Sequence, residues 1–227
     1  MLADAVRRIH GTRVHAWRGI GAGYNKFAVE SFLDEVAHAK GADPLAFRLE
    51  LTKGDARASA VIRAAAEMGD WTRKRGGDRA LGIAFGEYHG TLSAGVAEVS
   101  VNRKSGKIKV HNYWIAVDPG QVVQPENVHA QLESAVVYGL SAALIEELQI
   151  RNGAIAQSNF HDYKVLRMSD MPEIHTRIVA SDAAPTGMGE IGVVTVAPAI
   201  ANAVFRLTGK RLRSLPMSPA RVKGVLA

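Results

Sequence analysis

The chain has 227 residues, of which 47% are hydrophobic and 22% are charged, so it is long and apolar enough to bury at least one sizeable core. Its 28 Lys and Arg residues are interleaved with 22 Asp and Glu residues, so the net charge of +6 is not concentrated in a nucleic-acid-binding segment. The absence of cysteine excludes disulfides, thiolate nucleophiles, and cysteine-ligated zinc or iron–sulfur clusters on this chain. Any redox chemistry must therefore use a cofactor that the protein binds.

The hydropathy pattern predicts a soluble chain. No apolar run approaches the ~20 residues needed to cross a bilayer, and residues 1–8 lack the apolar stretch of a signal peptide. The densest basic run, Arg73-Lys74-Arg75, lies beside two glycines and Asp78, a pattern typical of a solvated loop.

The first part of the chain reads as helical. Apolar residues at helical spacing predict a helix over residues 26–40, which ends at Gly41. Pro44 lies near the first turn of a second helical stretch, and an alanine-rich segment predicts a third helix over 56–68.

The pattern then changes to a period of two residues. Strands are predicted over 94–101 and 107–117 as a hairpin, followed by a helix over 128–149, a strand over 173–180 and a helix over 196–208. The expected fold class is α+β, with a helical N-terminal region followed by mixed strands and helices. No internal domain boundary stands out.

A glycine cluster, Gly19-Ile20-Gly21-Ala22-Gly23, follows a strand-like stretch over 13–17 and precedes a helix. This order is that of a dinucleotide-binding loop, but the spacing is GxGxG and more helix follows, which favours a helix-entry loop over an NAD-binding Rossmann site. Arg18 directly before the cluster has two open interpretations. Its guanidinium can hold an anion beside the helix N-terminus, or pack on Trp17 at the surface.

The eight histidines show no metal-ligand spacing on a predicted helix. The sequence His161-Asp162-Tyr163 has the composition of a relay, but no serine near it lies in a nucleophile-elbow context. Hydrolase chemistry is therefore a weak third alternative.

Glu190 is the strongest single candidate for a catalytic group. It ends the loop Pro185-Thr186-Gly187-Met188-Gly189-Glu190 and is followed by apolar residues. A poorly solvated carboxylate takes up a proton readily, as a general base must, and the glycines permit close approach of a bulky cofactor. A turn or helix-capping carboxylate is the competing interpretation, and local context leaves the two near even.

Several of these segments occur together, and in the same order, in one protein family. The matching segments are Trp17-Arg18-Gly19-Ile20-Gly21, residues 27–37, Gly41-Ala42-Asp43-Pro44, residues 96–101, Val117-Asp118-Pro119-Gly120, Gln131-Leu132-Glu133, residues 159–163, Gly187-Met188-Gly189-Glu190, residues 197–203 and Leu215-Pro216. The whole chain resembles the C-terminal part of the molybdopterin-binding subunit of the xanthine oxidase and aldehyde oxidase family. The likeness is greatest to the branch of the isoquinoline 1-oxidoreductase β-subunits.

The resemblance implies a molybdenum hydroxylase that hydroxylates an N-heterocycle or oxidises an aldehyde, with water as the oxygen source. It implies a molybdopterin cofactor, in the cytosine dinucleotide form, whose molybdenum takes no protein ligand. Glu190 matches the catalytic base. The residues that match cofactor-contacting positions are Arg18, Gly19, Ile20, Gly21, Gln131 and Gly189.

The resemblance also implies partners, because family subunits are longer and carry further cofactor loops upstream. A small [2Fe-2S] subunit and the missing N-terminal segment are expected, and relatives are often exported to the periplasm. A truncated remnant or binding module that loads no cofactor is the alternative. Four positions depart from the family: Ser134-Ala135 replace paired glycines, Ile191 replaces a proline and Gln124 replaces an asparagine.

Overall fold

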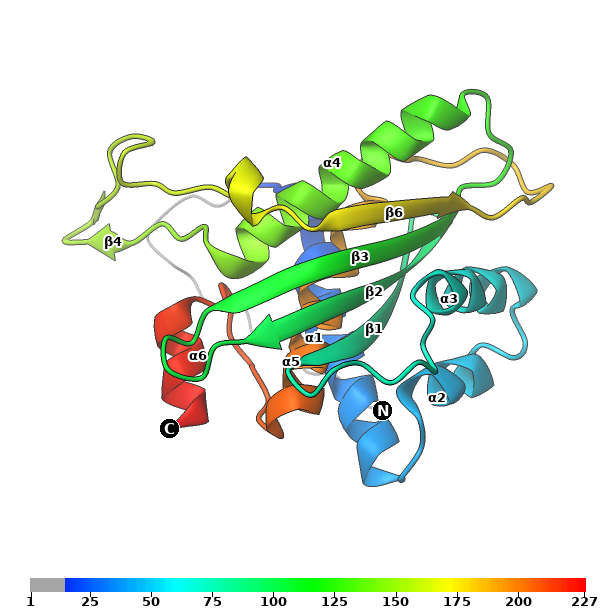
Figure 1. The fold of residues 1–227 in the computed structure, drawn as a ribbon. Coiled ribbons are helices and arrows are strands. Elements are labelled where there is room, and N and C mark those ends of the chain that lie inside the picture. Colours follow the sequence, from blue (N-terminus) through cyan, green and yellow to red (C-terminus); the bar gives the residue numbers. More distant parts are fainter. Residues whose placement is uncertain (1–14) are drawn as a thin grey trace.

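A computed structural model describes residues 15–227 of the chain. Its centre is a four-stranded sheet in the order β1-β2-β3-β6 (Figure 1). Strands β1 (Arg79–Tyr88), β2 (Thr91–Val101) and β3 (Ile108–Asp118) are consecutive and antiparallel, whereas β6 (Glu173–Ile178) pairs in parallel with β3. The α+β class predicted from the sequence is confirmed.

Helices cover both faces of this sheet (Figure 1). On one face, α1 (Ile20–Ala39), α4 (Pro125–Leu144) and α5 (Val196–Thr208) enclose the larger hydrophobic core. On the other face, α3 (Ala56–Met68) packs on β2 and β3 and encloses the smaller core. That helix leaves the remaining part of its face of the sheet uncovered (Figure 1).

The remaining elements are short. They are α2 (Pro44–Leu51), the two-stranded ribbon β4 (Ile150–Arg151) and β5 (Ala154–Ile155), the 3₁₀ turns η1 (Met168–Asp170) and η2 (Ile191–Val193), and α6 (Pro219–Leu226). The ribbon and the loop after it project from the body at the end of α4 (Figure 1).

Strand β1 is absent from the sequence prediction, and its packing explains the omission. At Gly82 a Cβ atom would lie 2.2 Å from the carbonyl oxygen of Ala199 and 2.3 Å from the nitrogen of Ala203. Helix α5 therefore lies directly on the strand backbone, and only glycine fits. Glycines weaken the strand pattern in the sequence, although here they are required for packing.

Three predicted helix boundaries need correction. Helix α4 begins at Pro125 rather than at residue 128, because proline is well suited to the first turn of a helix. Helix α1 begins at Ile20 rather than at residue 26, because the glycine cluster forms its first turn instead of a preceding loop. Helix α4 ends at Leu144 rather than at residue 149, since the N–H groups of Ile145 and Glu146 both bond the Ser141 carbonyl and close the last turn.

A buried charge network fastens α1 to α2. The Arg48 guanidinium, 2% exposed, donates to Glu30 Oε2 at 2.7 Å and lies 3.9 Å from Asp34. Glu30 Oε2 also accepts from the N–H of Phe85 at the edge strand β1. The charges are thus paired inside the fold, as buried ions require.

One described segment, Ile191–Thr208, is long and apolar enough by composition to span a membrane. However, 72% of it is buried inside the fold, and it includes α5, which packs on β1 and β2. Its apolar character is that of a core helix.

Candidate active site

Arg18 links three segments that are far apart in the sequence. Its Nε donates to the carbonyl oxygen of Gly189 at 2.7 Å, and its terminal nitrogens donate to Ser134 Oγ at 3.0 Å and to the carbonyl oxygen of Gln131 at 3.4 Å. The guanidinium also lies 5.6 Å from the ring centre of Tyr138. Arg18 therefore joins the start of α1, helix α4 and the loop that carries Glu190.

Glu190 is held from the opposite side of the same junction. The backbone N–H of Gly19 donates to Glu190 Oε1 at 3.0 Å. Gly19 has φ 94°, a left-handed conformation that favours glycine, and it turns the chain into α1. Within residues 15–227 the second carboxylate oxygen, Oε2, has no hydrogen-bond partner, so it is free to accept a proton.

The loop before Glu190 is bonded to the rest of the fold. Thr186 donates both its N–H and its hydroxyl to the carbonyl oxygen of Pro119, at 2.8 and 2.9 Å. The fully buried Thr91 places its hydroxyl oxygen 2.6 Å from Thr186 Oγ1 and 2.8 Å from the carbonyl oxygen of Gly187. These contacts fix the loop that presents the carboxylate.

The glycines of the loop leave open space beside the carboxylate. A Cβ on Gly187 would meet no atom within 4 Å, and one on Gly189 would meet only Gln131 Nε2 at 4.0 Å. The side chain of Gln131 is exposed and directed toward this space. A bulky group can approach the backbone here, so the residues present fit a pterin cofactor next to Glu190.

Ser134 and Ala135, which replace the paired glycines of the family, lie in different surroundings: Ser134 lies at the site and Ala135 in the core. Ser134 is exposed and accepts the hydrogen bond from Arg18. Ala135 is 1% exposed, and its Cβ lies 2.7 Å from the position that a Cβ on Gly192 would take. A glycine at 192 thus makes room for the alanine, whose side chain points into the core and not toward the cofactor space.

Two aromatic side chains, Trp17 and Tyr138, lie beside Arg18. Trp17 packs on Tyr138 with ring centres 5.4 Å apart. Burial lowers the pKa of the Arg18 guanidinium, while Tyr138 and Glu190 act in the opposite direction. Desolvation raises the pKa of Tyr88, and the negative charge of Glu190 adds to this effect.

All seven residues predicted from the resemblance lie at this junction. Arg18, Gly19, Gln131, Gly189 and Glu190 are linked by the contacts described above. Ile20 and Gly21 form the first turn of α1, with Ile20 44% exposed. Sequence reasoning missed Thr91 and Tyr138, since neither belongs to a recognisable motif.

Two alternative interpretations fail on geometry. The glycine cluster forms the first turn of α1, and residues 15–17 form no strand, so residues 15–227 contain no strand–glycine–helix unit of a Rossmann site at this cluster. The first two residues of the strand predicted over 13–17 lie outside the described part of the chain. Nor is His161-Asp162-Tyr163 a relay. Asp162 accepts from the N–H groups of Ser158 and Asn159, and Tyr163 donates to Glu146 at 2.6 Å.

Comparison with known proteins identifies the family. Residues 65–172 match the model of a molybdopterin cofactor-binding domain. The chain is 46% identical over 220 residues to the beta subunit of the isoquinoline 1-oxidoreductase of Brevundimonas diminuta, covering 96% of this chain and 28% of that protein. This chain belongs to the molybdenum hydroxylase large-subunit family.

Two further similarities agree with this assignment. A nicotinate dehydrogenase subunit of Pseudomonas putida is 35% identical over 227 residues, covering 92% of this chain and 19% of that protein. The aldehyde oxidoreductase of Desulfovibrio gigas shares the fold, with a TM-score of 0.80 at 14% identity over 93% of this chain and 41% of that chain. The chain spans less than a third of the length of these two curated relatives.

Proposed function

We propose that this chain supplies the general base of a molybdenum hydroxylase that hydroxylates an N-heterocycle or oxidises an aldehyde, using water as the oxygen source. The observation that carries the proposal is the carboxylate of Glu190. It is fixed by the Gly19 N–H at one oxygen, free at the other, and bordered by glycines with open space beside them.

Glu190, Gly19 and Arg18 have different roles in the proposed reaction. Glu190 takes a proton from the water-derived nucleophile through Oε2, while the Gly19 N–H holds Oε1 and fixes the direction of the free oxygen. Arg18 acts on the loop rather than on the substrate, because it holds the carbonyl oxygen of Gly189 next to the base. Such fixed geometry is what general-base catalysis needs.

A molybdopterin cofactor, in the cytosine dinucleotide form, would be held beside Gly187, Gly189 and the amide of Gln131, with Ile20 and Gly21 facing it from α1. When bound, it supplies the two-electron oxidation. The guanidinium of Arg18 is occupied by protein acceptors on three sides, so its contribution to binding is the shape of the junction.

The reaction releases two electrons, which must leave the chain. Since these 227 residues contain no cysteine, an iron–sulfur relay has to lie outside them. A small [2Fe-2S] subunit and the N-terminal segment that the relatives carry beyond the matched part are the proposed partners.

Metal analysis tests this proposal against a remnant that keeps the fold but loads no cofactor. The chain would be co-expressed with the polypeptides encoded next to it, purified, and assayed for molybdenum and for releasable pterin. Stoichiometric molybdenum and a cytidine-bearing pterin are expected. A folded assembly with neither would rule out the enzymatic function for this chain.

A further inference from the structure

The basic run Arg73-Lys74-Arg75 lies in the loop over residues 69–78, which joins α3 to β1 and separates two hollows in the surface. The hollow on the sheet side contains the carboxylates of Glu98 and Asp78. The other hollow lies between the loop and the C-terminal part of α5, and five of its lining residues are cationic: Arg73, Lys74, Arg75, Arg79 and Arg206. We call it the cationic cleft.

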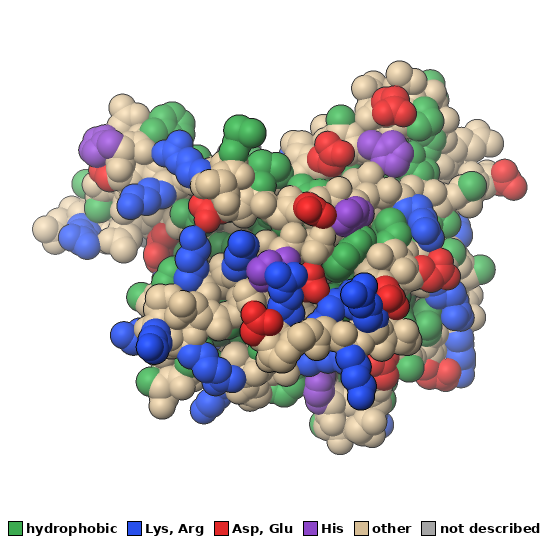
Figure 2. Space-filling view, in the orientation of Figure 1, with side chains coloured by type: hydrophobic (Ala, Val, Ile, Leu, Met, Phe, Trp, Pro, Cys, Tyr) green, Lys and Arg blue, Asp and Glu red, His purple; other side chains and the backbone are tan. Residues whose placement is uncertain are grey.

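No carboxylate lines the cationic cleft among the described residues. The four cationic residues of the loop and of the start of β1 also line the sheet-side hollow, where Arg75 and Arg79 lie 2.9 and 3.5 Å from Glu98. The side chains of Arg73, Lys74 and Arg206 make neither an ion pair nor a hydrogen bond within residues 15–227. Figure 2 shows lysine and arginine side chains gathered on the face that carries this loop. The cleft is therefore lined by three cationic side chains that have no ion-pair partner among the described residues.

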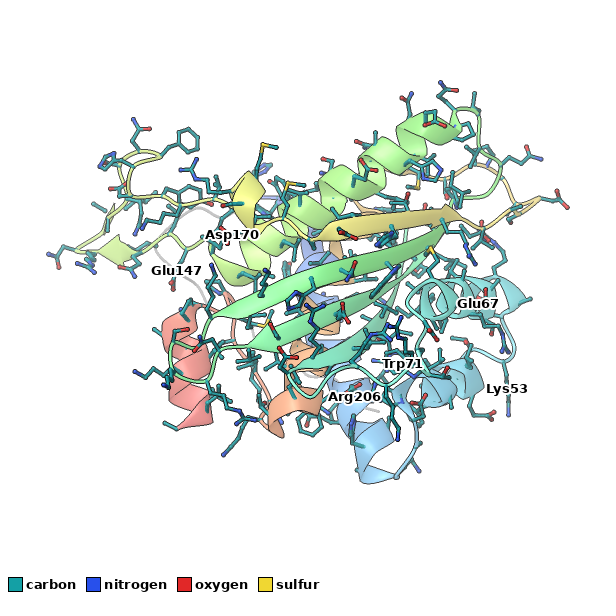
Figure 3. The ribbon with its side chains drawn as sticks, in the orientation of Figure 1. Lys53, Glu67, Trp71, Glu147, Asp170 and Arg206 are labelled. Carbon is teal, nitrogen blue, oxygen red and sulfur yellow. The ribbon has the colours of Figure 1, made fainter. Side chains whose placement is uncertain are left out.

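Arg206 is oriented by an aromatic ring. Its guanidinium lies 5.2 Å from the ring centre of Trp71, and the two side chains reach toward each other from α5 and from the end of α3 (Figure 3). Stacking on the indole leaves the N–H edge of the guanidinium free to donate. Asp43 borders a neighbouring hollow, but its carboxylate is already occupied by Trp71 Nε1 and by two N–H groups of α2.

We propose that the cationic cleft binds a small anion that carries at least two phosphate groups, such as pyrophosphate or a nucleoside diphosphate. The volume of about 370 Å³ falls within the range of small-molecule sites. An anion bridging Arg73, Lys74 and Arg206 would relieve their mutual repulsion through charge-assisted hydrogen bonds. A single orthophosphate reaches fewer of the cations at once.

This site is separate from the cofactor space beside Glu190. Glu190 precedes the N-terminal end of α5, whereas Arg206 lies near the C-terminal end of that 13-residue helix. At about 1.5 Å per residue, the two ends are roughly 20 Å apart. The proposal is thus independent of the enzymatic function.

Calorimetric titration of the full chain with inorganic pyrophosphate tests the proposal. Saturable binding is expected, and the triple variant Arg73→Gln, Lys74→Gln, Arg206→Gln should weaken it at least about tenfold. The matched control is Lys40→Gln, Lys164→Gln, Lys223→Gln, which removes the same charge from exposed lysines on other elements. The control variant should bind pyrophosphate with a Kd within about twofold of that of the parent protein.

Three results would overturn the proposal: no saturable binding to the parent, equal weakening in both triple variants, or orthophosphate binding as tightly as pyrophosphate. Equal weakening would show that only the net charge matters. Circular dichroism checks the fold of each variant. If the cleft triple is not folded, the single change Arg206→Gln provides the comparison, with Lys223→Gln as its control.

Discussion

The backbone N–H of Gly19 donates a 3.0 Å hydrogen bond to Oε1 of Glu190, a residue 171 positions further along the chain. This bond joins the turn that starts α1 to the loop that presents the carboxylate. Arg18 closes the same junction by donating to the Gly189 carbonyl oxygen. The base and its support thus come from opposite ends of the described chain, and each depends on the other for its position.

Removing the Arg18 guanidinium should loosen this junction. In Arg18→Gln the bond to Gly189 and the bond to Ser134 are both lost, and hydrogen bonds to charged groups are worth about 1.5–3 kcal/mol. Amide hydrogen exchange of Gly19, measured by NMR, should accelerate about tenfold or more. Ser134→Gly removes one bond and should give a smaller acceleration.

The control for this experiment is Arg167→Gln, an exposed arginine in the segment before η1. It should leave Gly19 exchange unchanged. If Arg18→Gln also leaves Gly19 exchange unchanged, Arg18 does not hold the junction.

The close packing of α5 on β1 predicts a large effect at one glycine. In Gly82→Ala the new Cβ meets backbone atoms of Ala199 and Ala203, which cannot move without shifting the helix. We expect a loss of about 1–3 kcal/mol or more in the free energy of unfolding, measured with urea. Gly224→Ala, in α6 with no atom within 4 Å of the added Cβ, should be neutral or stabilising by up to about 1 kcal/mol.

The buried network around Arg48 makes a second stability prediction. Arg48→Ala leaves the Glu30 carboxylate without its cationic partner inside the fold, whereas Asp34 keeps its ion pair with Arg211 at 2.7 Å. Removing one partner of the buried Arg48–Glu30 pair should cost about 3–5 kcal/mol. Lys53→Ala removes an ion pair with Glu50 in which both side chains are about 70% exposed, and should change stability by less than about 1 kcal/mol. Similar losses in the two variants would show that the network is not structural.

Acid should release the loop after the β4–β5 ribbon. Bonds from the N–H groups of Asn159 and Ser158 lower the pKa of Asp162 to about 2. Because this folded-state pKa lies below the ordinary value, the contribution is present above about pH 4 and is lost as the pH falls toward 2. Carbon-detected NMR of the carboxyl group should show this midpoint, and Asp162→Asn should abolish the loop's pH response. A midpoint near 4 would contradict the hydrogen-bonded loop.

The sequence predicted α3, α5, the β2–β3 hairpin and β6 because their residues follow the local pattern of each element. It did not predict β1, because glycine is a poor strand former. Glycine is required at position 82 by the close contact with helix α5, whose residues lie 117 or more positions away in the sequence. The start of α1 was placed late for a related reason. Its glycines are poor helix formers, and the turn at Gly19 is held by contacts with Glu190.

The candidate site was also only partly predictable from the sequence. Chain-wide resemblance indicated Glu190 and six neighbours, and the structure brings them together. The role of Arg18 as a link, the support from Thr91, and the burial of Ala135 against Gly192 all depend on pairs far apart in the sequence. No local spacing encodes such pairs.

Turnover by Glu190→Gln, in the assembly that carries molybdenum, tests the account most directly. Glutamine keeps an oxygen that can accept the Gly19 N–H but cannot serve as a base, so turnover should fall by about 10²–10⁴-fold while the molybdenum content stays unchanged. The exposed Glu173→Gln is the control and should retain full activity. Turnover by Glu190→Gln equal to that of the parent, at equal molybdenum content, would contradict the assignment of Glu190 as the base.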